Sequence, residues 1–282
     1  MKAKAKTKPL KIVGRHDEMS QLQLAIRLGR NLLIEGPVGV GKTFLVLEVL
    51  QELNREFVRV DGDSRYTEQK LTGWFDPPLV LKKGYTASCF IDGPLVEAMR
   101  GGKILFVNEL NRMPEAVQNI LLPAMDERQI VLPKIGQIQA KVGFAVVATQ
   151  NPREFTATHA LSEALLDRFE MLPLDYQSRE EELEILTRQV SQSDKAVRER
   201  ALDLVRATRQ HGSIKRGGSV RAALAICRLV EGGAEFSTAA LMALPSRIEM
   251  VSSEENPRDV ILQLLSSNSF PQIDEKKKDL RR

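Results

Sequence analysis

A glycine-rich run between a short apolar stretch and a helical pattern carries the clearest chemistry in the sequence. The run fits the pattern G-x-x-x-x-G-K-[ST], in which glycines let backbone amides turn toward phosphates at a helix N-terminus. Its last two residues, Lys42 and Thr43, would reach the outer phosphates and ligate Mg²⁺. The alternative is a glycine-rich turn that fits by chance. The pattern predicts a site for ATP and Mg²⁺ formed by Gly36, Pro37, Val38, Gly39, Val40, Gly41, Lys42 and Thr43.

Two polar residues, Asn108 and Glu109, follow the apolar stretch Ile104 to Val107, in which a strand is expected. A strand that ends in polar residues places them at the carboxyl edge of a sheet, beside the phosphates. Glu109 is the candidate base for the attacking water, and a solvated glutamate is the alternative. P-loop ATPases usually carry an aspartate where this chain has Asn108. Because asparagine keeps an oxygen acceptor but loses the charge, we expect weaker Mg²⁺ binding by Thr43 and Asn108, and slowed hydrolysis.

The composition is that of a packed globular protein with one large domain or two unequal ones. The 282 residues are 43% hydrophobic and 28% charged, and the longest apolar stretches have the length of strands. We therefore expect no membrane insertion. No apolar signal core follows the first lysines, and we expect a cytoplasmic protein. Two cysteines, far apart and outside any CxxC pair, indicate neither a disulfide framework nor a zinc site.

The net charge of +4 comes from a lysine-rich N-terminal segment. Its lysines leave the rest of the chain close to neutral, so the basic residues are not arranged as a stripe on a folded surface. We expect residues 1–10 to be a solvated, disordered tail, and we do not expect a nucleic-acid partner. The lysines are Lys2, Lys4, Lys6, Lys8 and Lys11.

Short apolar runs alternate with helical patterns up to Pro173, which predicts an α/β domain with a parallel sheet covered on both faces. Helices are expected around Asp17 to Leu28, Lys42 to Leu53 and Pro114 to Glu127. Pro123 should kink the last of these. The five expected strands are Leu32 to Glu35, Phe57 to Asp61, Ile104 to Asn108, Phe144 to Thr149 and Met171 to Leu174.

Beyond Asp175 the pattern predicts an all-helical domain. Ser178 and Glu181 form a capping box before an amphipathic pattern, and Ser219 is a candidate N-cap after two glycines. The stretch Asp76 to Pro94 is expected to be irregular, and its length is typical of a functional insert. The predicted organisation is a basic tail at 1–10, an ATPase core at 11–175, a helical lid at 176–268 and a charged tail at 269–282.

Several further motifs make the chain resemble the AAA+ superfamily, and especially its MoxR branch, from about Lys11 to Ala225. Two departures from that branch are Asn108 in place of aspartate and Pro123 inside a helix. The matching segments are Ile12-Val13-Gly14-Arg15, the glycine-rich run, Asn108-Glu109-Leu110-Asn111-Arg112, Val117-Gln118-Asn119, Met125-Asp126-Glu127-Arg128, Ala148-Thr149-Gln150-Asn151-Pro152 and Leu161-Ser162-Glu163-Ala164-Leu165-Leu166-Asp167-Arg168-Phe169.

The resemblance implies roles for individual residues. Asn151 becomes the polar sensor of the γ-phosphate, and Ile12 and Val13 would border the adenine. Arg168 becomes the arginine finger that enters a neighbouring subunit's site, with an arginine answering nearby carboxylates as the alternative. Arg221 becomes the sensor arginine of the lid, with an exposed first-turn arginine as the alternative. An arginine acting on a neighbour implies a homo-oligomeric ring, expected to be a hexamer.

Proteins of this kind use ATP hydrolysis to remodel, mature or activate client proteins, some with a partner that carries a von Willebrand factor A domain. The resemblance implies inserts at Leu79 to Pro94 and at a hairpin of Gln129 to Leu132 with Gln137 to Gln139 that face a pore or client, unless they are plain loops. One alternative is a nucleotide-gated switch with little hydrolysis. Another is a DNA-acting AAA+ motor, disfavoured by the aromatic content of 5% and the lack of a recognisable DNA-binding domain.

Overall fold

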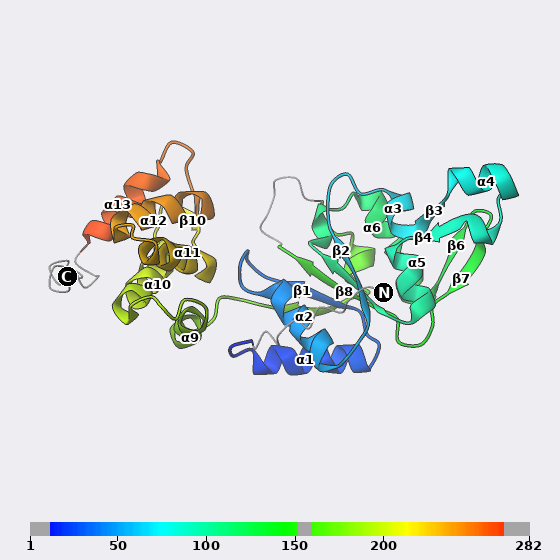
Figure 1. The fold of residues 1–282 in the computed structure, drawn as a ribbon, viewed down its shortest axis with the longest axis horizontal. Coiled ribbons are helices and arrows are strands. Elements are labelled where there is room, and N and C mark those ends of the chain that lie inside the picture. The colour runs from blue at the N-terminus through cyan, green and yellow to red at the C-terminus, as the bar shows by residue number, and fades with distance from the viewer. Residues whose placement is uncertain (1–11, 152–158, 268–282) are drawn as a thin grey trace. The chain divides into compact units, whose positions relative to one another are not determined.

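The chain forms two units, a parallel sheet with its helices and a mainly helical bundle that begins at Tyr176 (Figure 1). Three residues of the glycine-rich run, Val38–Val40, group with the second unit. The computed structural model describes residues 12–151 and 159–267. The two predicted tails, 1–10 and 269–282, lie outside these described residues. Within the described ranges no helix is both long enough and apolar enough to cross a bilayer.

The first unit contains five parallel strands in the order β2-β5-β8-β1-β9. The expected strands are confirmed, with the last two displaced by one residue. The register pairs Glu35 with Gln150 and Asp61 with Asn108, so these strands end at one common edge. That edge receives the residues that follow each strand. The strands are β1 (Leu32–Glu35), β2 (Phe57–Asp61), β5 (Ile104–Asn108), β8 (Ala145–Gln150) and β9 (Glu170–Pro173).

Helices cover both faces of this sheet. In β1, Leu33 packs into a core cluster shared with α5 (Pro94–Gly101), while its neighbours Leu32 and Ile34 are equally buried on the opposite face. Burial of consecutive residues is typical of a central strand in a parallel sheet. Helix α1 (His16–Arg27) packs on β9 and on α2 (Lys42–Glu52), and the smaller α3 (Glu68–Thr72) packs on α5.

The single helix expected at Pro114 to Glu127 is two shorter helices. They are α6 (Glu115–Asn119) and α7 (Leu121–Asp126), and they meet at Ile120. The break confirms the effect expected of Pro123, which cannot donate a backbone hydrogen bond to the carbonyl of Asn119. Helix α7 packs on a short helix, α8 (Glu163–Leu166), and on the strand β6 (Gln129–Leu132) that follows α7 in the chain.

The expectation that residues 76–94 are irregular is wrong. They contain most of a small substructure in which β3 (Gly73–Phe75) pairs with β4 (Phe90–Asp92) around α4 (Pro77–Lys83) and the short 3-10 turn Ala87–Cys89. The Phe75 ring makes edge-on contacts with the rings of Tyr85 at 5.1 Å and Phe90 at 5.2 Å, which connect β3 with the rest of the substructure. These elements are shorter than the windows in which hydrophobic periodicity can be recognised.

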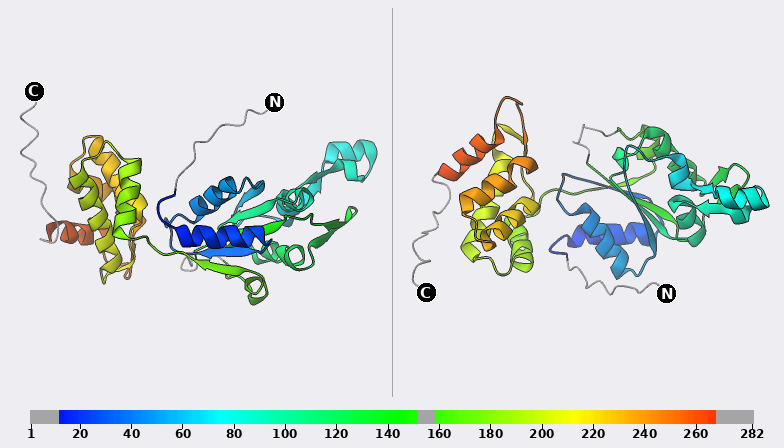
Figure 2. Two further views of the ribbon diagram at one scale, coloured as in Figure 1. Left: turned by 90° about the horizontal axis from the view of Figure 1, so that it is seen from below. Right: turned by 45° about the horizontal axis from the view of Figure 1, so that its top comes forward.

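The predicted hairpin is confirmed as β6 (Gln129–Leu132) and β7 (Gly136–Gln139). Figures 1 and 2 show that it projects from the same end of the first unit as α4. The Lys134 ammonium lies 3.4 Å from the Tyr85 ring, which links the two inserts.

The second unit is the helical domain that the sequence predicts, with one exception to the all-helical expectation. Two short strands, β10 (Ile214–Arg216) and β11 (Glu249–Met250), pair antiparallel. Lys215 and Arg216 both contact the carboxylate of Glu249 across this pair, a long-range contact that local patterns do not reveal. The helices are α9 (Arg179–Gln189), α10 (Lys195–Gln210), α11 (Val220–Glu231), α12 (Phe236–Ala243) and α13 (Pro257–Ser266).

Two predicted helix starts in this unit behave differently. Ser178 and Glu181 form the expected capping box. The Ser178 hydroxyl accepts a hydrogen bond from the backbone N–H of Glu181, and the Glu181 carboxylate accepts one from the backbone N–H of Ser178. Ser219 does occupy the N-cap position of α11, but its side chain makes no capping hydrogen bond.

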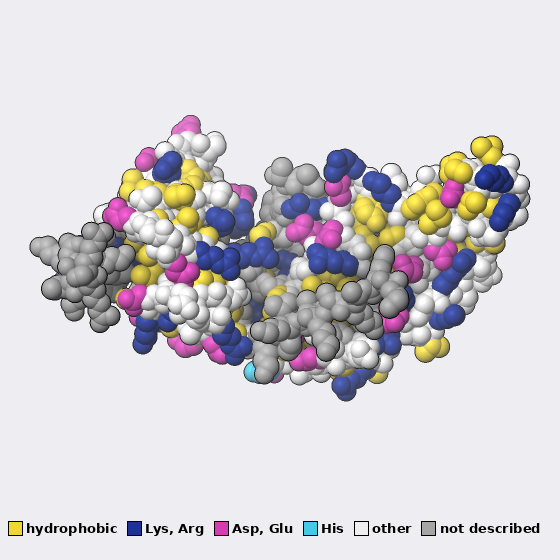
Figure 3. Space-filling view, in the orientation of Figure 1, with side chains coloured by type: hydrophobic (Ala, Val, Ile, Leu, Met, Phe, Trp, Pro, Cys, Tyr) yellow, Lys and Arg dark blue, Asp and Glu magenta, His cyan; other side chains and the backbone are white. Residues whose placement is uncertain are grey.

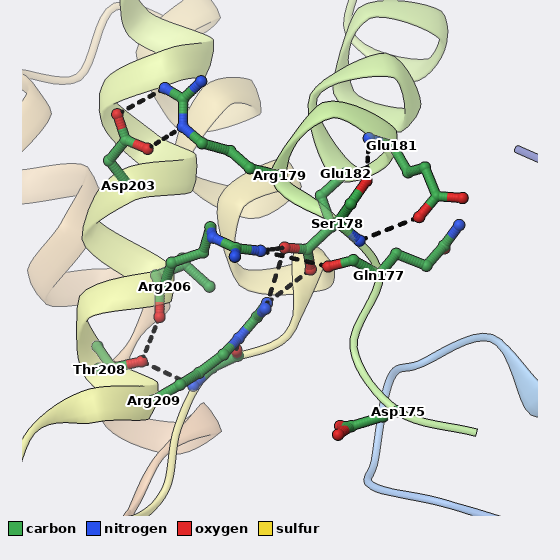
Figure 4. A network of polar contacts seen from close by, with 12 residues as sticks. Asp175, Gln177, Ser178, Arg179, Glu181, Glu182, Asp203, Arg206, Thr208 and Arg209 are labelled. Atoms are coloured by element: carbon green, nitrogen blue, oxygen red, sulfur yellow. Dashed lines mark hydrogen bonds and ion pairs between the residues drawn. The ribbon is translucent and has the colours of Figure 1, made fainter. Parts of the chain in front are cut away.

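A buried carboxylate, Glu182, joins two helices of the second unit (Figure 4). It is 2% exposed and accepts from Arg206 at 2.8 Å and from Arg209 at 2.7 Å. The Arg209 guanidinium also lies 3.8 Å from the Tyr176 ring and donates to the Gly218 carbonyl at 2.8 Å. This cluster connects the start of the unit, at Tyr176, with the segment that leads into α11.

We expect Glu182→Ala to lower the free energy of unfolding of the second unit by about 3 kcal/mol, because the largely buried Arg209 and the partly buried Arg206 lose their carboxylate. Circular dichroism in urea follows the helices of both units, while the fluorescence of Trp74, the single tryptophan, follows the first alone. A loss of helical signal without a change in fluorescence therefore reports the second unit. Glu184→Ala is the matched control: Glu184 is an exposed partner of Arg188 on the same helix, and its loss should change stability by at most about 0.5 kcal/mol. Equal effects of the two variants would contradict the prediction.

Candidate active site

The glycine-rich run forms the turn between β1 and α2. Gly39 and Gly41 have φ angles of 85° and 96°, a left-handed conformation that favours glycine. A Cβ at Gly36 would collide with the carbonyl of Leu174 on the neighbouring chain segment. Lys42 donates from Nζ to the carbonyls of Gly36 at 2.5 Å and Pro37 at 2.9 Å, so its ammonium lies across the turn. The first turn of α2 has no capping side chain, as a phosphate site requires.

The side chain of Asn108 is the junction between this turn and the sheet edge. Its Oδ1 accepts from the Thr43 hydroxyl at 2.7 Å and from the Thr149 hydroxyl at 3.1 Å. Its Nδ2 donates to Oδ1 of Asp61 at 2.9 Å. One amide therefore connects the end of β2, the end of β8 and the first turn of α2.

Glu109 is held at both its backbone and its carboxylate. It adopts a left-handed conformation with φ of 59°, and its backbone N–H donates to the Thr149 hydroxyl at 2.9 Å. Its carboxylate pairs with Arg112 at 2.7 Å, and both side chains are about 40% exposed. A Cβ at Gly62 would collide with the Glu109 carbonyl, so glycine is required where the chain leaves β2.

Asp61 and Thr149 belong to this edge, but the sequence analysis did not select them. Arg59, two residues earlier on β2, binds the Asp61 carboxylate at 2.7 Å. This guanidinium and the Asn108 amide hold the pKa of Asp61 below its ordinary value, against the opposing effect of burial. Both residues stand at the end of an expected strand, which is the signal that could have found them.

The remaining candidates of the first unit are Asn151, at this edge, and Ile12 and Val13, near the start of the described chain. Asn151 directly follows β8 and is buried, and its carbonyl accepts from the Asn111 side chain at 3.2 Å. Val13 is also buried, and the backbone N–H of Ile12 donates to the carboxylate of Glu48 on α2. That hydrogen bond lowers the pKa of Glu48, but burial is the larger effect and the net shift is upward.

Of the two candidate arginines, Arg168 is not part of this edge. Arg168 precedes β9, whose first residue Glu170 pairs with Leu32 at the opposite, amino end of β1. Its guanidinium pairs with Asp126 at 2.5 Å and donates to the Ala164 carbonyl, rather than answering Asp167 or Glu163. Arg221 belongs to the second unit, where it is exposed in the first turn of α11.

The donors at the edge fit a Mg²⁺ ion that arrives with a nucleotide. Mg²⁺ prefers oxygen ligands and commonly takes one or two from the protein and the rest from phosphates and water. The oxygens of Thr43 and Asn108 are 2.7 Å apart and match that requirement. Among the described residues no three His, Cys, Asp or Glu side chains gather as a metal site. The donor set thus suits a metal held with phosphate rather than by protein alone.

The parallel sheet, the glycine-rich turn and the polar edge define a P-loop α/β protein of the nucleotide-binding class. Residues 31–169 match the model of the AAA domain (dynein-related subfamily). The chain is 30% identical to the gas vesicle ATPase GvpN of Haloferax mediterranei over 206 residues, 67% of this chain and 59% of that protein. An uncharacterised protein of Staphylococcus haemolyticus is 30% identical over 209 residues, which cover 72% and 79% of the two chains. The chain belongs to the AAA+ ATPases, in their MoxR branch.

Solved structures support the same fold. A Cytophaga hutchinsonii protein assigned as an ATPase aligns over 93% of this chain and 92% of its own, with a TM-score of 0.50 and 23% identity. The Thermotoga maritima RuvB Holliday junction branch migration motor aligns over 90% and 69%, with a TM-score of 0.53 and 20% identity. At these identities the likeness concerns the fold alone. The chain spans about three fifths of the length of the gas vesicle ATPases it matches.

We expect Thr149→Val to lower the free energy of unfolding of the first unit by about 1 kcal/mol. The buried hydroxyl connects Asn108 with the Glu109 backbone, and valine leaves that N–H without its acceptor. Urea unfolding followed by Trp74 fluorescence measures the change. Thr149→Ser, which keeps the hydroxyl, is the control. Its free energy of unfolding should be closer to that of the wild type than to that of Thr149→Val. A serine variant as unstable as the valine variant would argue against the hydrogen bonds as the cause.

Proposed function

We propose that this chain is an ATPase that hydrolyses ATP with Mg²⁺ between its P-loop and the polar edge of its sheet. The observation that carries the proposal is the hydrogen bond between Thr43, in the first turn after the P-loop, and Asn108, next to Glu109. It brings a phosphate-binding turn, metal-compatible oxygens and a carboxylate to one place. The names of the gas vesicle relatives, which are ATPases, support the same activity.

Each residue at the edge has a proposed role in the reaction. Lys42 exchanges its carbonyl partners for the outer phosphates, and Thr43 and Asn108 present oxygens to Mg²⁺, which offsets phosphate charge when bound. Glu109 orients and deprotonates the attacking water once its carboxylate turns away from Arg112. Asn151 senses the γ-phosphate from the end of β8, and Ile12 and Val13 border the adenine.

Arg168 is proposed to act in trans. It lies at the amino end of β9, across the sheet from the P-loop edge, and so it is poorly placed for the site of its own subunit. In a ring, expected to be a hexamer, the same surface can face the site of a neighbour. The guanidinium would then leave Asp126 to offset charge on the transferred phosphoryl group. Arg221 is proposed as the contact from the helical lid.

The proposed work of the cycle is remodelling or activating a client protein in the cytoplasm, with a von Willebrand factor A-domain protein as the candidate partner. We assign this work to the inserts that carry α4 and the β6–β7 hairpin. No residue of α4 is buried, and Leu81 is 89% exposed. Val131 on the hairpin is 73% exposed, and Figure 3 shows hydrophobic side chains gathered over the end of the first unit that carries α4. Exposed apolar surface of this kind suits contact with another protein.

One observation favours a second candidate, a nucleotide-gated switch. The carboxylate of Glu109 is engaged by Arg112 at 2.7 Å, and Asn108 lacks the charge of the usual aspartate. If Arg112 kept the base engaged in the presence of ATP, binding would change the conformation while hydrolysis stayed slow.

Two substitutions separate binding from hydrolysis. Lys42→Ala should abolish ATP binding, because the outer phosphates lose their cation. Glu109→Gln should bind ATP as the wild type does, yet release phosphate at least about 100-fold more slowly, because the amide cannot take up the proton of water. A fluorescent ATP analogue measures binding and a phosphate sensor measures turnover. Glu115→Gln, an exposed glutamate on α6, is the control. A wild type no faster than Glu109→Gln would favour the switch.

Mixing two inactive variants tests whether Arg168 acts in trans. Arg168→Ala subunits keep an intact P-loop edge, and Glu109→Gln subunits keep the arginine. Each alone should hydrolyse ATP at least about 10-fold more slowly than the wild type, and a mixture should recover activity where an Arg168-bearing subunit adjoins an intact edge. Recovery should vary with the mixing ratio, and size-exclusion chromatography with nucleotide should show an oligomer. A mixture that gains nothing, or a chain that stays monomeric, would contradict a trans arginine.

A further inference from the structure

Asp61 donates no group to the proposed reaction, but its side chain contacts that of Asn108, the candidate Mg²⁺ ligand. It is the last residue of β2, in register with Asn108 at the end of β5. Its Oδ1 accepts from Nδ2 of Asn108 at 2.9 Å. The other anchor of the carboxylate is Arg59, one pleat earlier on the same face of β2, so the acceptor atom has a defined position.

The partners of Asn108 determine which way its amide points. A carboxylate only accepts hydrogen bonds, so the amide nitrogen must face Asp61. The amide oxygen then faces the hydroxyls of Thr43 and Thr149, which both donate to it. With the amide turned over, its NH₂ group would face Thr43, and an N–H cannot ligate a cation.

We propose that Asp61 is a positioning residue that fixes the Asn108 amide with its oxygen toward the Mg²⁺ side of the site. The aspartate–amide pair of this edge is thus divided between two strands, with the acid on β2 and the amide on β5. This inference rests on the proposed function for the identity of the metal, but the pairing of the two side chains is a property of the protein alone. Partners behind a metal ligand commonly contribute 10- to 100-fold to metal affinity.

A swap of the two side chains tests the proposal. Asp61→Ala removes the acceptor and should raise the Mg²⁺ concentration that half-maximally promotes ADP binding by about 10-fold. Asn108→Asp places two carboxylates in contact, and it should lower the unfolding temperature of the nucleotide-free protein by roughly 3 °C. The double variant Asp61→Asn with Asn108→Asp restores an acid–amide pair in the opposite order. It should recover both the unfolding temperature and the Mg²⁺ dependence.

The decisive result is that Asp61→Asn is unfavourable in one background and favourable in the other. Asp61→Asn should weaken Mg²⁺-dependent ADP binding when residue 108 is asparagine, and should stabilise the protein when residue 108 is aspartate. Equal effects of Asp61→Asn in both backgrounds, or an Asp61→Ala variant with the Mg²⁺ dependence of the wild type, would overturn the proposal. Asp63→Asn is the matched control, since Asp63 is a nearby carboxylate whose arginine partner is Arg65.

The readouts also separate this inference from the proposed function. ADP binding and thermal unfolding involve no hydrolysis, so an inactive protein with the predicted sign change would disprove the ATPase while supporting the role of Asp61. A protein that binds no nucleotide would disprove the site, and its unfolding temperatures would still decide whether Asp61 and Asn108 are coupled.

Discussion

The hydrogen bonds of one amide, that of Asn108, hold together the part of the molecule on which its chemistry depends. The amide oxygen accepts two hydroxyls and the amide nitrogen meets a carboxylate, so both ends of the group are engaged. This arrangement is possible because the parallel strands end in register at one edge, where side chains from β2, β5 and β8 converge. A shift of one strand by a single residue would turn these side chains to the other face and disperse the site.

The local parts of this arrangement could be predicted from the sequence, and the long-range parts could not. The P-loop, the five strands and the capping box at Ser178 are encoded within a few neighbouring residues, and the structure contains all of them. The contact between Asp61 and Asn108 depends on which strands are neighbours, and strand order is not visible in hydrophobic periodicity. The same limit applies to the β10–β11 pair. Helix α4 was missed for a different reason, because seven residues without a buried face carry no amphipathic pattern.

The position of Arg168 gives the oligomeric interpretation a physical basis beyond resemblance. A residue before β9 lies at the amino end of the sheet, and β1 separates it from the P-loop by four residues, roughly 13 Å of strand. The ion pair with Asp126 balances the charge of the Arg168 guanidinium in the single chain. The pair is partly exposed, so the cost of separating it is small compared with that of a buried pair. Separation of Arg168 from Asp126 would therefore cost the fold little stability.

The backbone at Glu109 suggests how the candidate base is kept in place. A left-handed conformation at a non-glycine residue costs about 1–2 kcal/mol, so the surrounding contacts must maintain it. The Thr149 hydroxyl receives the Glu109 N–H, and the absence of a side chain at Gly62 admits its carbonyl. The candidate base is thus positioned through its main chain, while its carboxylate pairs with the half-exposed Arg112. Such a division would let the carboxylate leave Arg112 without moving the strand that carries Asn108.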